Sequence, residues 1–121
     1  MQIGPFTIAN GAALSDTVTM SRIERGIAKN MAPVALLCPA EVTSASLQIE
    51  HSFDGGTTWY ATAPLATADA VSIADDDANS VRKSIPLDPA RYLGMGPTIR
   101  LRTSGNEGQD DVFYLLFAKV S

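Results

Sequence analysis

The chain has one histidine, His51, which is followed directly by Ser52 and two residues further on by Asp54. Histidine, a hydroxyl and a carboxylate are the groups that serine hydrolases use to activate a nucleophile. Neighbouring residues of a strand point to opposite faces, so Ser52 would face away from His51. The Gly-x-Ser-x-Gly sequence that exposes such a nucleophile is also missing. We therefore predict that His51 is a buried or rim residue held by a hydrogen bond, and that the chain is not an enzyme.

Oxygen ligands for a cation could come from the three consecutive acids Asp75, Asp76 and Asp77. Their spacing departs from the Asp-x-Asp-x-Asp-Gly pattern of calcium loops, which favours a solvated acidic loop and leaves cation binding there open. With one Cys and one His in the chain, neither an internal disulfide nor a zinc site can form. Cys38 is therefore predicted to be a small core residue. No glycine-rich phosphate loop is present either, so we expect no cofactor.

The sharpest local motif spans residues 52–59 and matches the Asp-box pattern Ser-x-Asp-x-Gly-x-Thr-Trp, which is known from the hairpins of sialidase-like propellers. In such a turn Asp accepts hydrogen bonds from backbone N–H groups, the glycines adopt positive φ, and Trp folds back as an apolar anchor. A propeller repeats this hairpin over several blades, and here it occurs once. The pattern therefore predicts a structural turn rather than a glycosidase site. Its residues are Ser52, Asp54, Gly55, Gly56 and Trp59.

The elements that must position these residues are predicted to be strands. Turn residues recur at intervals of about ten positions, which is typical of a sandwich or barrel. We predict one all-β domain over residues 1–121, an antiparallel β-sandwich of jelly-roll type with eight or nine short strands and one helical turn near Asp88. The expected strands are residues 6–9, 17–23, 34–38, 46–53, 57–61, 70–73, 81–87, 98–103 and 112–120.

Residues 46–53 alternate, with Leu47, Ile49, His51 and Phe53 on the apolar side and Gln48, Glu50 and Ser52 on the other. This pattern predicts a strand with one wet face.

Residues 98–103 alternate in the same way and place Arg100 and Arg102 on an outer face. Two interpretations stay open for these guanidinium groups. They form a recognition surface together with Arg91 and Tyr92, or they are balanced by acids from the neighbouring strand region. Those acids are Glu107, Asp110 and Asp111.

The last predicted strand does not alternate: residues 112–118 are apolar at every position. A strand of this kind is apolar on both faces, as in a strand that is covered on both sides. It is therefore predicted to be either a central strand or part of an interface.

Charge and hydropathy exclude several partners. The chain has 9 Lys plus Arg against 13 Asp plus Glu, a formal net charge of -4, which argues against binding nucleic acid or anionic membranes. Its longest apolar runs, residues 33–38 and 112–118, are far shorter than the ~20 residues that span a bilayer. The N-terminal residues lack the basic start and apolar stretch of a secretory signal, so we expect synthesis in a cytoplasm.

Four stretches, in this order, resemble a widespread group of small virion proteins of tailed bacteriophages: residues 8–15, 52–60, 87–94, and 99–105 before an apolar final strand. The resemblance implies a β-sandwich, often a jelly roll, that sits on the capsid exterior as a cement or decoration subunit. It further implies the major capsid protein as partner and a homo-oligomer, commonly a trimer.

We therefore expect a decoration protein of the virion that stabilises the shell. The interface residues that we predict are Phe6, Arg100, Arg102, Phe113, Leu115 and Phe117. The alternative is a carbohydrate-binding β-sandwich module of a phage tail or receptor-binding assembly. Its stacking platform would consist of Trp59, Tyr60 and Tyr92.

Overall fold

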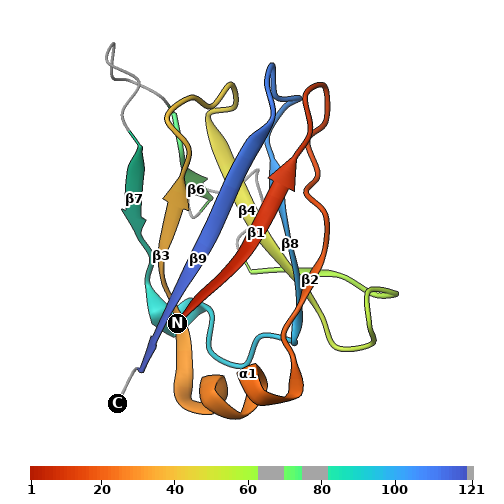
Figure 1. Cartoon of the computed structure of the whole chain (residues 1–121), viewed down its shortest axis with the longest axis vertical. Helices are drawn as coiled ribbons and strands as arrows, with labels where there is room; N and C mark the ends of the chain where they lie inside the picture. The colour runs from red at the N-terminus through yellow and green to blue at the C-terminus, as the bar shows by residue number, and fades with distance from the viewer. Residues whose placement is uncertain (63–69, 75–81, 120–121) are drawn as a thin grey trace.

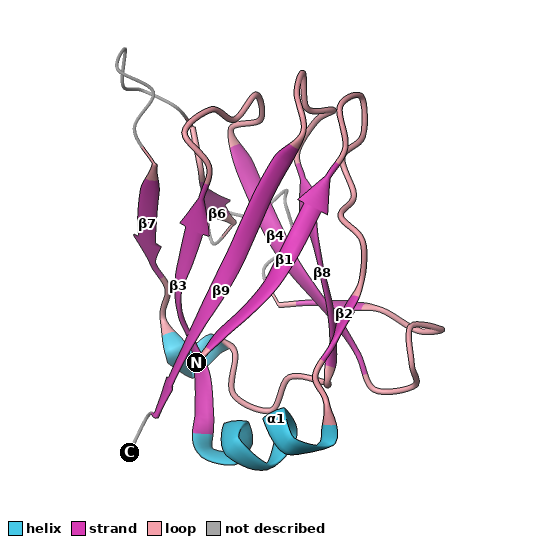
Figure 2. Cartoon of the chain, in the orientation of Figure 1, coloured by secondary structure: helices cyan, strands magenta, loops and turns pink. Residues whose placement is uncertain are grey.

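The computed structural model describes residues 1–62, 70–74 and 82–119, and these form two antiparallel sheets packed face to face (Figure 2). One sheet has the strand order β1-β9-β3-β7, and the other has the order β2-β8-β4-β5 with β6 paired to β4. The predicted all-β sandwich is thus confirmed. The strands are β1 Gln2–Ile8, β2 Val18–Thr19, β3 Met31–Cys38, β4 Ser46–Ser52, β5 Tyr60–Ala61, β6 Val71–Ser72, β7 Lys83–Pro86, β8 Thr98–Thr103 and β9 Asp111–Lys119.

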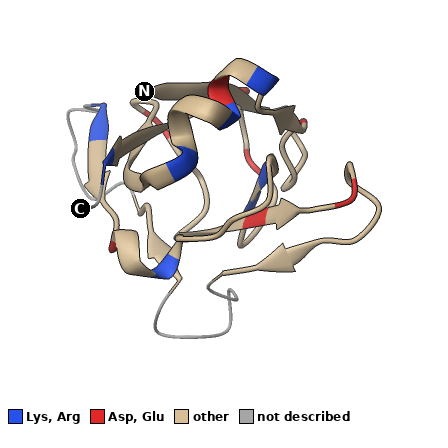
Figure 3. Ribbon diagram, turned by 90° about the horizontal axis from the view of Figure 1, so that it is seen from below, with Lys and Arg blue, Asp and Glu red and all other residues tan. Residues whose placement is uncertain are grey.

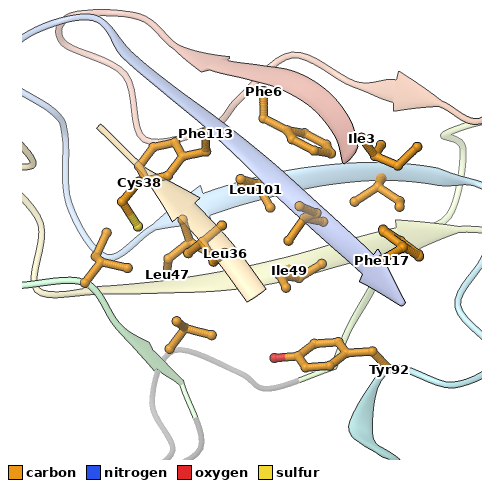
Figure 4. Packing of buried hydrophobic residues seen from close by; sticks show 14 of the residues in the cluster. Ile3, Phe6, Leu36, Cys38, Leu47, Ile49, Tyr92, Leu101, Phe113 and Phe117 are labelled. Carbon is orange, nitrogen blue, oxygen red and sulfur yellow. The ribbon is translucent and has the colours of Figure 1, made fainter. Parts of the chain in front are cut away.

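The core lies between the two sheets, where Phe6 and Phe113 pack with Leu36 from one side and Leu47 from the other (Figure 4). Each of these four side chains is fully buried. Cys38 belongs to the same cluster, as predicted, and burial raises the pKa of its thiol to about 11. The thiol is therefore a small apolar core group at neutral pH.

Strand β9 is a central strand, because it pairs with β1 on one side and with β3 on the other. Its side chains alternate: Phe113, Leu115 and Phe117 are buried, whereas Val112 and Leu116 are exposed on the outer face. Every second residue of the continuous apolar run thus packs in the core, and the residues between them lie on the outer face.

The alternation of β8 is confirmed, since Ile99 and Leu101 are fully buried and the two arginines face outward. The wet face predicted for β4 is wrong. Gln48, Glu50 and Ser52 point away from the core and are nevertheless buried. Both arginines of β8 donate to the Glu50 carboxylate, and the Ser52 hydroxyl accepts from the turn that follows it.

The strand predicted over residues 17–23 is also wrong in its second half. Only β2 forms there, and helix α1, Arg22–Ile27, follows it and continues into the 3-10 turn η1, Ala28–Asn30. Ser21 caps α1 by a reciprocal pair of hydrogen bonds with Glu24. This capping box satisfies N–H groups that a helix start leaves open, so it ends the strand.

The helical turn predicted near Asp88 is confirmed as η2, Pro89–Arg91. The Asp88 carboxylate accepts a hydrogen bond from the Ala90 N–H at 3.1 Å, and Pro89 occupies the first position. Gly94 follows with a φ of 80°, a conformation that glycine adopts without strain.

The two ends of the sandwich differ (Figure 1). At the upper end lie the connections β1–β2, β3–β4 and β8–β9, and across the lower end runs α1. Both edge strands of the four-stranded sheet carry a proline, Pro5 in β1 and Pro86 in β7. Among the residues described above, no helix combines the length and apolar character needed to cross a bilayer.

Candidate interaction surface

The Asp-box turn connects β4 to β5 and has the predicted geometry. The Ser52 hydroxyl donates to Asp54 Oδ1 at 2.7 Å and accepts from the Gly56 N–H at 2.9 Å, while Asp54 Oδ1 also accepts from the Thr58 N–H at 2.8 Å. Gly55 and Gly56 have φ values of 75° and 101°. The Ser52 and Thr58 hydrogen bonds lower the pKa of Asp54 to about 2, so the carboxylate is ionised at neutral pH.

Trp59, the last residue of the motif, lies under an arginine. The Arg100 guanidinium is 4.0 Å from the centroid of the Trp59 ring, which is a cation–π contact. The hairpin is thereby fastened to β8 by its own tryptophan.

The arginines of β8 are balanced by Glu50, and the expectation of balance by Glu107, Asp110 and Asp111 is wrong. Arg100 Nε donates to Glu50 Oε1 at 2.6 Å, and Arg102 Nε donates to Oε2 at 2.9 Å. The strand register explains why Glu50 is the partner of these arginines, because Glu50 lies directly opposite Arg100 across the strand pair. Burial alone would raise the pKa of Glu50, but hydrogen bonds from both arginines and from Gln48 outweigh burial and lower it.

The predicted interface residues fall into two groups. Arg100 and Arg102 are engaged with Glu50, and only the Arg102 side chain is substantially exposed. The four apolar residues are buried in the core, so their assignment to an interface is wrong. Their side chains pack together between the two sheets (Figure 4). These four are Phe6, Phe113, Leu115 and Phe117.

His51 is held at the rim of the core by a hydrogen bond, as predicted. Its Nδ1 accepts from the Gly96 N–H at 3.0 Å, and desolvation by burial lowers its pKa. Its ring contacts the exposed rings of Phe53 and Tyr60, with centroid separations of 5.3 Å and 6.0 Å. We call these three residues the aromatic cluster.

The stacking platform expected from Trp59, Tyr60 and Tyr92 does not form. Tyr92 is buried in the core, where burial raises its pKa, and Trp59 is stacked with Arg100. Tyr92 is likewise no part of a recognition surface with the β8 arginines. The exposed aromatic surface comes from Phe53 and Tyr60 instead.

Three large apolar side chains at the lower end are more than half exposed. Ile23 and Ile27 of α1 are 77% and 58% exposed, and Leu93 is 54% exposed. Ile23 and Ile27 stand four residues apart, so they occupy the same side of the helix. A helix of a globular protein normally turns such a stripe toward the core, whereas α1 buries none of its residues.

Leu93 and α1 border one pocket of about 230 Å³. Its apolar lining comes from the methionines Met20, Met31 and Met95 and from Tyr92 and Phe117. Methionine adapts its shape to different partners and is favoured at interfaces. We call Ile23, Ile27, Leu93 and this pocket the lower-end surface.

Three basic residues lie along the helical segment of the lower-end surface. Arg22, Arg25 and Lys29 lie on or directly after α1, and Arg25 and Lys29 also line the pocket. The one acid of this segment, Glu24, is occupied by the helix cap. Figure 3 shows these basic residues along the helical segment when the molecule is seen from below. A chain with a net charge of -4 thus presents a basic, apolar end.

Sequence reasoning missed this surface, although signals for it were present. Ser21 and Glu24 have the spacing of a capping box, and the isoleucines that follow have helical spacing. Residues 17–23 were instead predicted to be a single strand because they lie between two turn signals. The acidic run Asp75–Asp77 lies outside the described residues.

Comparison of the chain with protein families, with curated proteins and with solved structures finds no match. The function must therefore be argued from the surfaces of the molecule.

Proposed function

We propose that this protein is a bacteriophage virion structural protein that decorates the capsid exterior and stabilises it by binding major capsid subunits. The observation that carries the proposal is the lower-end surface, where exposed apolar side chains lie beside three basic ones. The resemblance of four sequence stretches to decoration proteins supplies the kind of partner. The partner surface should be apolar and edged with acidic residues, because complementary charge orients the two partners and fixes their register.

We also propose that the sandwich is a jelly roll. With β6 set aside as a short addition to β4, the sheets have the orders β1-β9-β3-β7 and β2-β8-β4-β5. The first strand then pairs with the last, and the second pairs with the next to last. Two interleaved four-stranded sheets support this proposal, since a jelly roll consists of eight strands in two Greek keys.

Energetics are consistent with a lattice-wide role. Burying an exposed Ile or Leu side chain completely contributes about 1.5–3 kcal/mol. Three such residues give a modest contact, because association also costs translational and rotational freedom. Many copies on one shell, and trimers that dock at several points at once, would turn modest contacts into stable decoration by avidity.

The decisive experiment is quantitative mass spectrometry of purified virions of the source phage. A ratio near one copy per major capsid subunit is the expected result. A few copies per virion, or none, would contradict the decoration role.

A pair of variants tests the surface itself. Ile27→Asp should fold normally and fail to decorate expanded capsids, because it places a carboxylate on the lower-end surface. Phe53→Asp is the matched control, since it makes the same kind of change at an exposed residue of the aromatic cluster. Decoration that survives Ile27→Asp and is lost in Phe53→Asp would move the docking site to the aromatic cluster.

The aromatic cluster supports a second candidate, a carbohydrate-binding module of a tail or receptor-binding assembly. Phe53 and Tyr60 expose their rings beside His51, and exposed aromatic rings stack on apolar faces of ligands. A glycan array with wild type and Tyr60→Ala separates the two candidates. Binding that depends on Tyr60 would favour this module, and an array without binding would remove it.

A further inference from the structure

Glu107 joins the β1–β2, β3–β4 and β8–β9 connections at the upper end. Its backbone N–H donates to the Ala12 carbonyl at 2.8 Å, and its own carbonyl accepts from the Gly11 N–H at 2.7 Å. Its carboxylate accepts from the N–H groups of Thr43 and Ser44 at 2.9 Å and 3.0 Å, and from the Ser44 hydroxyl. One buried side chain thus fastens the β3–β4 connection to β8–β9, while its backbone fastens β1–β2.

Asp111, the first residue of β9, brings a second carboxyl group to the same place. Both Asp111 and Glu107 are only 1% exposed, and each carboxyl group acts on the pKa of the other. Gln109 Nε2 donates to Asp111 Oδ1 at 2.8 Å, whereas Asp111 Oδ2 has no donor among the described residues. A hydrogen bond between two carboxyl groups requires a proton on one of them.

The surroundings do not favour two negative charges. Asp110 adds a carboxylate next to the pair, where it accepts from the Asn10 N–H at 2.8 Å. The Cys38 thiol of β3 is neutral at pH 7, because burial raises its pKa. The positive charge of Lys83 in β7 lowers that pKa, and the negative charge of Asp111 raises it. A buried pair of adjacent carboxylates in such a setting holds one proton.

We propose that Glu107 and Asp111 bind one proton between them near neutral pH, and that this proton holds the connections of the upper end together. As a carboxylic acid, Asp111 donates from Oδ2 to Glu107, and Glu107 keeps its charge for the Thr43 and Ser44 donors. The unpartnered oxygen and the crowded charges are explained by the same proton. The inference does not depend on what the lower-end surface binds.

The titration directions agree with this geometry. Burial and the hydrogen bond to Glu107 raise the pKa of Asp111 to about 7. Burial would raise the pKa of Glu107 as well, but hydrogen bonds from Asp111 and from Ser44 outweigh burial and lower it. Because the folded pKa of Asp111 exceeds its unfolded value, its contribution to stability is complete below the unfolded pKa and is lost as pH rises through about 7.

Thermal unfolding of wild type and Asp111→Asn between pH 5 and 9 tests the proposal. The asparagine amide can donate to Glu107 at every pH, so it mimics the protonated acid. Relative to this variant, wild type should lose about 5 °C of Tm between pH 6 and 8. His51 titrates with a lowered pKa in both proteins, so it cancels from the difference. Asp110→Asn removes a neighbouring charge, and this control variant should still show the loss of Tm between pH 6 and 8.

Identical pH profiles for wild type and Asp111→Asn would overturn the proposal. A Tm of wild type that Ca²⁺ raises at pH 8, and EDTA lowers again, would also overturn it, because a cation would then join the carboxylates. Carboxyl carbon NMR of wild type gives an answer that needs no variant. An Asp111 midpoint near pH 7 is expected, and a midpoint near pH 4 would contradict the shared proton.

Discussion

The upper and lower ends of the sandwich use their side chains in opposite ways. At the upper end, the polar groups of three connections are hydrogen-bonded within the chain, and Glu107 is their common partner. At the lower end, Ile23, Ile27 and Leu93 stay exposed although they are apolar. One end is complete in the isolated chain, and the other leaves apolar side chains exposed that the proposed partner would cover.

This difference separates the roles of stability and binding. Substitutions at the upper end should lower the free energy of unfolding, because they leave buried donors without acceptors. Substitutions on the lower-end surface should leave that free energy nearly unchanged and act on association. The four predictions below test this separation.

The largest effect is expected for Glu107→Ala. The Thr43 and Ser44 N–H groups and the Ser44 hydroxyl would lose their acceptor, at a cost of about 3 kcal/mol or more. Urea unfolding at pH 7 measures the change. A decrease in the free energy of unfolding below about 1 kcal/mol would mean that Glu107 does not hold the upper-end connections together.

Ser44→Ala should cost less, about 1–2 kcal/mol. Its hydroxyl lies between Glu107 and the Gly105 carbonyl and accepts from the Gly105 N–H at 3.2 Å, but the Ser44 N–H bond to Glu107 survives the change. The same urea experiment gives the value. An effect as large as that of Glu107→Ala would show that the hydroxyl, rather than the backbone, holds the carboxylate.

Asp54→Ala should lower the Tm at neutral pH by a smaller amount, because it removes the acceptor of the Ser52 and Thr58 donors. The folded pKa of Asp54, about 2, lies below its unfolded value. Its contribution is therefore present above the unfolded pKa and is lost as pH falls through about 2. Calorimetry of both proteins from pH 5 to pH 2 should show two Tm curves that converge, and parallel curves would count against this explanation.

The smallest effect is expected for the double variant Ile23→Ser and Ile27→Ser. Both residues are exposed and their helix propensities resemble that of serine, so the change should stay within about 0.5 kcal/mol. Binding to expanded capsids should weaken strongly in a co-sedimentation assay. A stability loss above about 2 kcal/mol would mean that the lower-end isoleucines support the fold after all.

Local patterns predicted much of the fold. Alternation placed Ile99 and Leu101 in the core, and the residue types of the Asp-box turn predicted its positive φ angles and its hydrogen bonds. Such features depend on neighbours in sequence, so one chain segment contains all the information. The helical turn at Asp88 was predictable for the same reason.

Features that depend on strand pairing were not predictable. Only the register of β4 against β8 shows that Glu50, rather than an acid near β9, meets the two arginines. The burial of Phe117 depends likewise on which face of β9 the second sheet covers. The lower-end surface was missed for a local reason, since the capping box at Ser21 lies inside the segment that was predicted to be one strand.

Prolines at both edges of the four-stranded sheet affect how neighbouring copies of the chain can contact one another. A decorated shell would hold copies of this chain close together, which raises the chance that one sheet extends into the next. Proline has no N–H for a ladder, so Pro5 and Pro86 make both edges poor templates for an added strand. Neighbouring copies are thereby directed to contacts between side chains, which can be made and broken without fusing the subunits into a continuous fibre.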